Sequence, residues 1–359
     1  MSKMNLKTMK KTTKSNLITY AMVIVIFAVV QILVATGSMS SLMQGLLVPL
    51  CTYSIVAIGL NLCVGYLGEL SLGHAGFMCV GAFSSAFFTR CMENSSMNPT
   101  LRFIIALLIG TAVAAFFGFL IGIPVLRLRG DYLAIVTLAF GEIIKNVINV
   151  LYVGKDENGL HFAINDSKSL NMSGTGEMII DGAKGITGTP RQSTFLIGVI
   201  LILVALFVVF NLVNSRSGRA IMAIRDNRIA AESVGINITK FKLMAFTISA
   251  AIAGAGGVLY AHTLSSLIAQ PANFGYNMSI MILVFVVLGG MGSFRGSIIA
   301  AVVLTMLPEV LRGLRDYRML IYAVVLIAMM LFNWAPAAIT WRQTHSLKNL
   351  FAKKTKEVQ

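Results

Sequence analysis

The sequence predicts an all-α, polytopic integral membrane protein with about ten transmembrane helices. Two observations carry this prediction. The 359 residues are 57% hydrophobic and only 12% charged, whereas a soluble domain has roughly 45–50% apolar and about 25% charged residues. The apolar residues also gather in runs of about 18 to 25 residues, long enough to cross a hydrocarbon core about 30 Å thick.

These runs define the predicted organisation of the chain. A basic N-terminus (1–16) precedes a transmembrane domain (17–341), and a basic tail (342–359) follows it. We expect the first run to be an uncleaved span, because it exceeds a signal-peptide core in length and no A-x-A site follows it. The predicted spans are 17–37, 41–64, 74–92, 102–126, 131–153, 193–213, 241–262, 277–291, 296–312 and 319–340.

The distribution of Lys and Arg predicts the orientation. With the N-terminus in the cytoplasm, nineteen of the 29 basic residues fall in cytoplasmic segments and nine on the opposite side, as the positive-inside rule requires. We therefore expect both termini and the loop 214–240 in the cytoplasm. The loop 154–192 lies outside, and its length without a helical pattern indicates a functional or disordered segment. Three arginines between 312 and 318 fall on the non-cytoplasmic side, against the positive-inside rule. We therefore expect any error in the span count near 277–318.

Composition also bounds the chemistry. The net charge of +15 does not indicate nucleic acid, because the basic residues lie between apolar runs. The four cysteines, Cys51, Cys63, Cys79 and Cys91, have no metal-ligand spacing, and they are typical of small core residues. The sequence contains neither a phosphate-binding G-x-x-x-x-G-K-[ST] loop nor a nucleophile motif. We expect no catalytic residue, no metal and no cofactor, and any ATP must be bound by another chain.

The segment from Gly218 to Gly235 is the most informative one. Asp226 or Asn227 can cap a helix start, and Gly235 suits a left-handed position at a helix end. The residues between them include small and apolar side chains, which favour helix-in-groove docking to a partner. The alternative is a surface loop whose arginines only set the topology. The side chains that could contact a partner are Arg225, Arg228, Ile229, Ala230, Ala231 and Val234.

This segment resembles the EAA-type coupling motif of ABC importer permeases, with Ala230-Ala231-Glu232 followed by Gly235. Other stretches resemble the branched-chain amino acid permease family, in particular its longer, M-type subunit. They are Gly59–Gly65, Ser71–Phe77, Leu126–Tyr132, Thr137–Ile144 and Gly289–Ser293, and their order covers roughly residues 17–340. The outer loop departs from the family pattern, because it is longer and only Asp181–Gly188 resembles the family.

The resemblance implies a permease subunit that forms half of the membrane pathway of an ABC importer in a bacterial-type inner membrane. It implies four kinds of partner: a second, shorter permease subunit, two cytoplasmic ATPase subunits that bind ATP, an extracytoplasmic solute-binding protein and the lipid bilayer. The implied substrates are leucine, isoleucine and valine, and the related urea and short-amide branch stays open. The candidate ATPase-coupling residues are Gly218, Arg219, Arg225, Asp226, Ala230, Ala231, Glu232 and Gly235.

Polar residues inside the fifth predicted span are candidates for a solute pathway. Glu142, Lys145, Asn146 and Asn149 recur at spacings of three and four, which place them on one side of a helix. Ionisable groups at membrane depth are costly and normally face a bundle interior or a wet cavity. They form either a stripe on the solute path or a structural Glu–Lys pair. A proton relay through the pair would instead indicate an ion-coupled secondary transporter.

Three polar residues lie near the second and third predicted spans. His74 is either a gating residue or a hydrogen-bonded structural histidine. Glu69, in the glycine-containing segment 65–73, either contacts a cytoplasmic partner or stabilises a bend. Asn61 belongs to the family-like stretch. The candidate pathway residues are Asn61, His74, Glu142, Lys145 and Asn146.

Overall fold

The computed structural model describes residues 11–37, 39–93, 97–128, 130–156, 159–164, 170, 176–311 and single positions between 317 and 331. The chain divides into two compact units, residues 1–302 and 303–359, and the first contains both candidate sites. The α-helices are α1 Lys11–Ala35, α2 Ser41–Asn61, α3 His74–Cys91, α4 Pro99–Val125, α5 Asp131–Val150, α6 Phe195–Asn214, α7 Arg216–Asp226, α8 Arg228–Ser233, α9 Ile238–Ala261, α10 Pro271–Phe274, α11 Tyr276–Gly289 and α12 Phe294–Val310.

Most of the described residues are helical, and the helices follow the predicted spans. A helix lies at each predicted span from 17–37 to 296–312. Within the described part of the chain, seven helical segments are long and apolar enough to cross a membrane. They are 16–35, 41–67, 99–125, 131–150, 195–214, 238–261 and 271–289. These segments confirm a polytopic helical membrane protein. The tenth predicted span, 319–340, falls largely outside the described residues, as do the tail 342–359 and residues 1–10.

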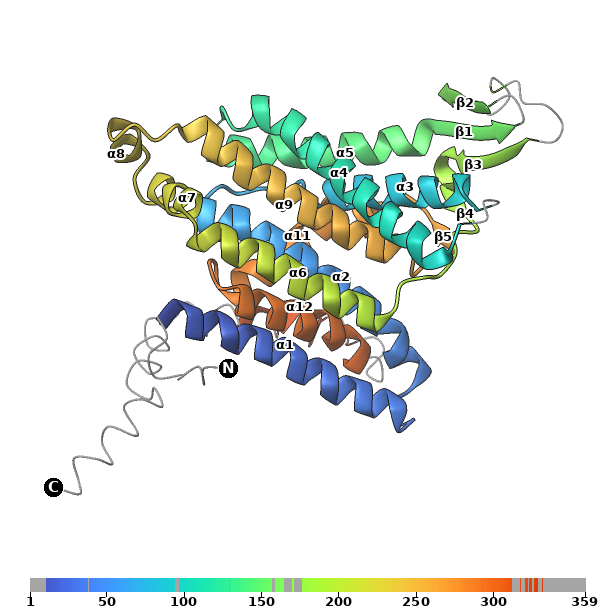
Figure 1. The fold of residues 1–359 in the computed structure, drawn as a ribbon, viewed down its shortest axis with the longest axis horizontal. Helices are drawn as coiled ribbons and strands as arrows, with labels where there is room; N and C mark the ends of the chain where they lie inside the picture. The colour runs from blue at the N-terminus through green and yellow to red at the C-terminus, as the bar shows by residue number, and fades with distance from the viewer. Residues whose placement is uncertain are drawn as a thin grey trace. The chain divides into compact units, whose positions relative to one another are not determined.

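The expectation of an all-α chain is wrong in the long loop 154–192. Its described residues contain a three-stranded antiparallel sheet in the order β2-β1-β3, and β4 pairs with β5. The strands are β1 Leu151–Asp156, β2 Gly159–Ile164, β3 Glu177–Asp181, β4 Ile186–Thr187 and β5 Ser266–Leu267. The fifth span ends at Val150 rather than at 153, because β1 continues directly from α5. In Figure 1 the sheet extends from the end of α5, while α7 and α8 lie at the opposite end of the bundle.

Two of the membrane helices are interrupted. The second span continues from α2 into a π-helix, Leu62–Leu67, which ends at Gly68 with φ +78°. The chain then runs without regular structure to α3, so the predicted segment 65–73 is the end of a π-helix and an extended connection. The short α10 and α11 form one apolar segment that is broken at Gly275.

Close helix packing in the bundle core depends on glycine. The central helices α2, α3 and α9 are largely buried. A Cβ atom on Gly81 of α3 would lie 2.6 Å from the Gly254 Cα atom of α9. On α4, a Cβ atom on Gly118 would lie 2.4 Å from the Ala250 Cβ atom, so α4 and α9 also pack closely there. Membrane helices associate through small residues because lipid offers no hydrophobic driving force between them.

Candidate functional site

The helix pair α7–α8 begins at a tight corner after α6. The Ser215 hydroxyl caps α7 by accepting the Gly218 backbone N–H at 3.1 Å. Gly218 is buried, and a Cβ atom there would collide with the carbonyl oxygens of Leu212 and Val213. Arg219 is exposed, and its guanidinium donates to the Asn214 carbonyl at 3.4 Å. Gly218 therefore sets the angle between α6 and α7.

Arg225 attaches the end of α7 to the membrane bundle. Its guanidinium donates to the Gly65 carbonyl at 2.8 Å and to Asp226 Oδ1 at 2.9 and 3.1 Å. The aliphatic part of Arg225 lies against Gly68, where a Cβ atom would come 2.6 Å from the Arg225 Cγ atom. These contacts attach the end of α7 to the π-helix that ends the second span.

The helix predicted between the cap at Asp226 or Asn227 and Gly235 is present as the short α8. Arg225 and Asp226 end α7, and α8 covers only Arg228–Ser233. Asn227 caps α8 by accepting the Ala230 N–H at 3.0 Å, so Asn227 rather than Asp226 is the capping residue. Gly235 has φ +84°, which confirms the predicted left-handed position.

The two sides of α8 differ in exposure. Ala231 is buried and packs with Ile224 and Ile238 of the same chain. This corrects the expectation that Ala231 faces a partner: its small side chain allows α8 to approach its own bundle. On the other side, Ile229 is 81% and Val234 is 75% exposed. Ala230 and Glu232 are also exposed, so the outer side of α8 combines apolar residues with one carboxylate.

Asn61, a candidate pathway residue, is completely buried. Its amide nitrogen donates to the Ser297 hydroxyl at 2.7 Å, and its amide oxygen accepts the Gly292 N–H at 2.8 Å. Asn61 therefore connects the end of α2 to the turn between α11 and α12.

His74 connects three helices. Its Nε2 lies 2.6 Å from the Ser249 hydroxyl, which itself donates to the Gly59 carbonyl at 2.5 Å. Because the Ser249 proton is used in that bond, Nε2–H of His74 is the donor and Nδ1 accepts from Ser71 at 3.2 Å. Both ring nitrogens thus have partners within the bundle, as the structural interpretation of His74 requires.

Glu142 and Lys145 form the predicted ion pair on α5, and Glu142 has a second partner. Its other oxygen accepts the Tyr276 N–H at 2.7 Å, so a carboxylate lies at the positive N-terminal end of α11. Lys145 is buried, whereas Asn146 is exposed. Asn149 donates to the Ala269 carbonyl at 3.1 Å. Of the predicted stripe, only Asn146 has its side chain on the exposed surface of α5.

One ion pair within the bundle was not predicted from the sequence. Lys242, at the start of α9, is buried and pairs with Glu69 from the segment between the π-helix and α3. This contact favours the structural interpretation of Glu69, because its carboxylate pairs within the chain across the bend. The sequence signal for this pair was Lys242 at the start of an apolar run, because a lysine at membrane depth requires a partner. In the part of the chain that the structure describes, no three His, Cys, Asp or Glu residues gather as a metal site.

These features define a polytopic helical membrane protein. Its internal polar groups connect helices, and a short helix at one end presents uncovered apolar residues.

Comparison with known proteins then places the chain in a family. The family model described as "Branched-chain amino acid transport system / permease component" matches residues 42–332. The high-affinity branched-chain amino acid transport system permease protein LivM of Salmonella typhimurium is 37% identical over 298 residues, which are 80% of this chain and 67% of the relative. LivM of Escherichia coli is 36% identical over 314 residues, or 84% and 71%. The chain therefore belongs to the branched-chain amino acid transport permease family.

A weaker similarity reaches the permease protein LivH. LivH of Salmonella typhimurium is 22% identical over 258 residues, which are 70% of this chain and 79% of the relative. No solved structure matches the chain significantly.

Proposed function

We infer that this chain is the M-type permease subunit of an ABC importer for branched-chain amino acids. The family match over residues 42–332 and the identity to two LivM proteins support this function. The relatives are transport permeases, and the sequence lacks a phosphate-binding loop. ATP hydrolysis is therefore assigned to separate subunits.

We propose that α7 and α8 form the contact through which those ATPase subunits move the membrane bundle. The observation that carries this proposal is the exposure of Ile229 on the six-residue helix α8 and of Val234 directly after it, while the other side of α8 is packed. Exposed apolar residues in water favour a protein contact. Arg225 then connects α7 to the Gly65 carbonyl, so that motion at α8 reaches the second span.

The remaining partners and the orientation belong to the same proposal. A second permease subunit of the LivH type completes the pathway, and an extracytoplasmic binding protein delivers the amino acid. Both termini and α8 lie in the cytoplasm, as the excess of basic residues favours. On α5, the exposed Asn146 and the neighbouring Glu142 mark the flank that faces the pathway. A polar amide facing lipid would be costly, whereas one facing a wet pathway is not.

The double change Ile229→Ser and Val234→Ser tests this function. The surface of α8 would lose its apolar contacts while its buried side stays intact. We expect about tenfold weaker retention of the ATPase subunits, which corresponds to roughly 1.4 kcal/mol. The measurement is co-purification of these subunits together with substrate-stimulated ATP hydrolysis in vesicles.

A matched control is Ile164→Ser, which changes an isoleucine of β2 at the other end of the bundle that is 69% exposed. It should leave ATPase retention unchanged. If the α8 double variant keeps the ATPase subunits and the substrate-stimulated ATP hydrolysis at wild-type levels, α8 is not the ATPase contact and the segment is only a charged loop.

A further inference from the structure

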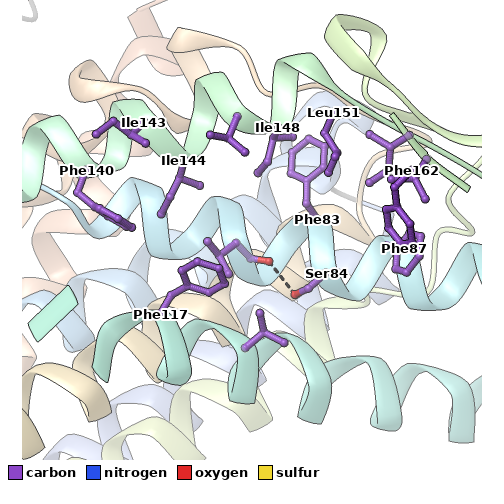
Figure 2. A pocket seen from close by; sticks show the side chains of 15 residues that line it. Phe83, Ser84, Phe87, Phe117, Phe140, Ile143, Ile144, Ile148, Leu151 and Phe162 are labelled. Carbon is purple, nitrogen blue, oxygen red and sulfur yellow. Dashed lines mark hydrogen bonds between the residues drawn. The ribbon is translucent and has the colours of Figure 1, made fainter. Parts of the chain in front are cut away.

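An apolar groove of 420 Å³ lies between α3, α4, α5 and the sheet. Figure 2 shows its aromatic and aliphatic side chains converging from these elements. The lining residues are Val80, Phe83, Ser84, Phe87, Val113, Phe117, Phe140, Ile143, Ile144, Val147, Ile148, Leu151, Val153, Phe162 and Ile180. Ile143, Val147 and Phe162 are each more than half exposed, so the groove opens to the surroundings of the bundle.

The groove cannot receive the transported amino acid. Its one polar side chain is Ser84, whose hydroxyl donates to the Val80 carbonyl at 2.7 Å. The ammonium and carboxylate groups of an amino acid would find no partner there, and an unpaired charge in such a site is very costly. The substance that fills this groove must itself be apolar.

The geometry of α5 separates the groove from the polar residues. Phe140, Ile144 and Ile148 recur every four residues and line the groove on one flank. Glu142 and Asn146 form a parallel row, two positions away along the helix. At 100° per residue the two rows face different directions. One flank of α5 is therefore polar and the other is entirely apolar.

The walls of the groove fit a flexible chain better than another helix. Membrane helices pack together through small residues, as Gly81 and Gly254 do between α3 and α9. The groove contains no glycine or alanine among its lining residues, and most of them are Phe, Ile or Val. Bulky walls around an open space favour a thin, deformable occupant.

The depth of the groove matches one leaflet. The twenty residues of α5 span about 30 Å, which is the thickness of the hydrocarbon core. The groove lies along the half of α5 from Phe140 to the start of the sheet. In β2, Ile164 pairs with Leu151 and Phe162 with Val153, so these exposed residues lie directly beyond the end of α5.

We propose that this groove holds an acyl chain of a phospholipid from the leaflet on the side of the sheet, with Phe162 and Ile164 of β2 resting in the interfacial region above it. The inference goes beyond the proposed function, because no step of transport or ATPase coupling is needed for it. The bound chain fills the space between α4 and α5 and keeps water away from the apolar flank of α5.

Quenching of an introduced tryptophan by brominated lipid tests the proposal. The assembled transporter is reconstituted in phosphatidylcholine vesicles brominated in the middle of the acyl chain. The native tryptophans are first replaced by Trp334→Phe and Trp341→Phe. Phe117→Trp then reports from the groove, and the adjacent Phe116→Trp, which is 59% exposed on α4, reports from the open surface.

We expect bromine to quench both reporters to a similar extent. Filling the groove with Ser84→Leu should lower the quenching of the Phe117→Trp reporter roughly two-fold, because the added methyl groups displace part of the lipid chain from the apolar walls. The quenching of Phe116→Trp should not change.

Three results would overturn the proposal. The first is a Phe117→Trp reporter that stays unquenched while Phe116→Trp is quenched, since another subunit or water would then occupy the groove. The second is quenching that Ser84→Leu leaves unaltered. The third is protection of Phe117→Trp by added leucine, which would place the solute there. Loss of ATPase retention affects none of these measurements, so the two proposals fail independently.

Discussion

The interior of the bundle and the surface of α8 both contain residues in an unfavourable environment. Only the residues of the interior have partners within the chain. In the interior, polar residues lie at membrane depth, and Asn61 and His74 each bond to two other groups of the chain. On α8 and directly after it, the apolar Ile229 and Val234 are largely exposed. Polar groups with internal partners stabilise the fold, whereas uncovered apolar groups indicate a surface for another protein.

This comparison predicts that interior changes reduce stability and that α8 changes reduce coupling. The largest effect is expected at the buried ion pair. Lys242→Met would leave the partly buried Glu69 carboxylate without its cation. Breaking a buried pair on one side typically costs about 3–5 kcal/mol. The expected result is a large loss of thermal stability in detergent, measured by the amount of transporter that remains monodisperse after heating.

The control for this prediction is the double change Lys242→Met and Glu69→Gln. It removes both charges, and it should recover much of the lost stability. If Lys242→Met alone remains as stable as the wild type, the pair does not hold the bend before α3. The distinction between interior and surface would then be weaker than the structure indicates.

A smaller effect is expected on α5. Glu142→Gln keeps an acceptor for the Tyr276 N–H but removes the charge that pairs with Lys145. A hydrogen bond to a charged group contributes about 1.5–3 kcal/mol, so a loss of roughly 2 kcal/mol is expected in the same heating assay.

Combining Glu142→Gln with Lys145→Met tests whether Glu142 has a structural role or lines the solute path. Restored stability and transport in the double variant would assign Glu142 a structural role at the start of α11. Restored stability without transport would place Glu142 on the solute path. The pair would have neither role if Glu142→Gln alone kept both properties at wild-type levels.

The smallest stability change is expected at the end of α8. Gly235 has φ +84°, with no atoms near its missing side chain. Gly235→Val introduces strain of about 1–2 kcal/mol in this left-handed conformation, confined to an exposed turn. Thermal stability should hardly change, whereas substrate-stimulated ATP hydrolysis should fall because α8 is no longer held in place.

Gly235→Asn is the matched variant, since asparagine tolerates the left-handed region far better than valine. It should keep stimulated hydrolysis near the wild-type level. Equal loss in both variants would mean that something other than backbone conformation at position 235 matters for coupling.

Several parts of the site could be predicted because they depend on neighbours in the chain. The cap at Asn227 and the left-handed Gly235 follow from local backbone preferences. The pairing of Glu142 with Lys145 follows from helical spacing. The orientation of Ala231 did not follow in the same way, because either side of a short helix could have faced the bundle.

The sequence by itself determined the class of this protein and the position of its helices. Runs of apolar residues must cross the membrane as helices, since lipid satisfies no backbone hydrogen bond. Only the tertiary structure decided which polar groups meet, as in Lys242 with Glu69 and the Tyr276 N–H with Glu142. It also decided that part of the loop 154–192 is a sheet. Contacts between residues far apart in sequence depend on which surfaces pack together, and no local pattern contains that information.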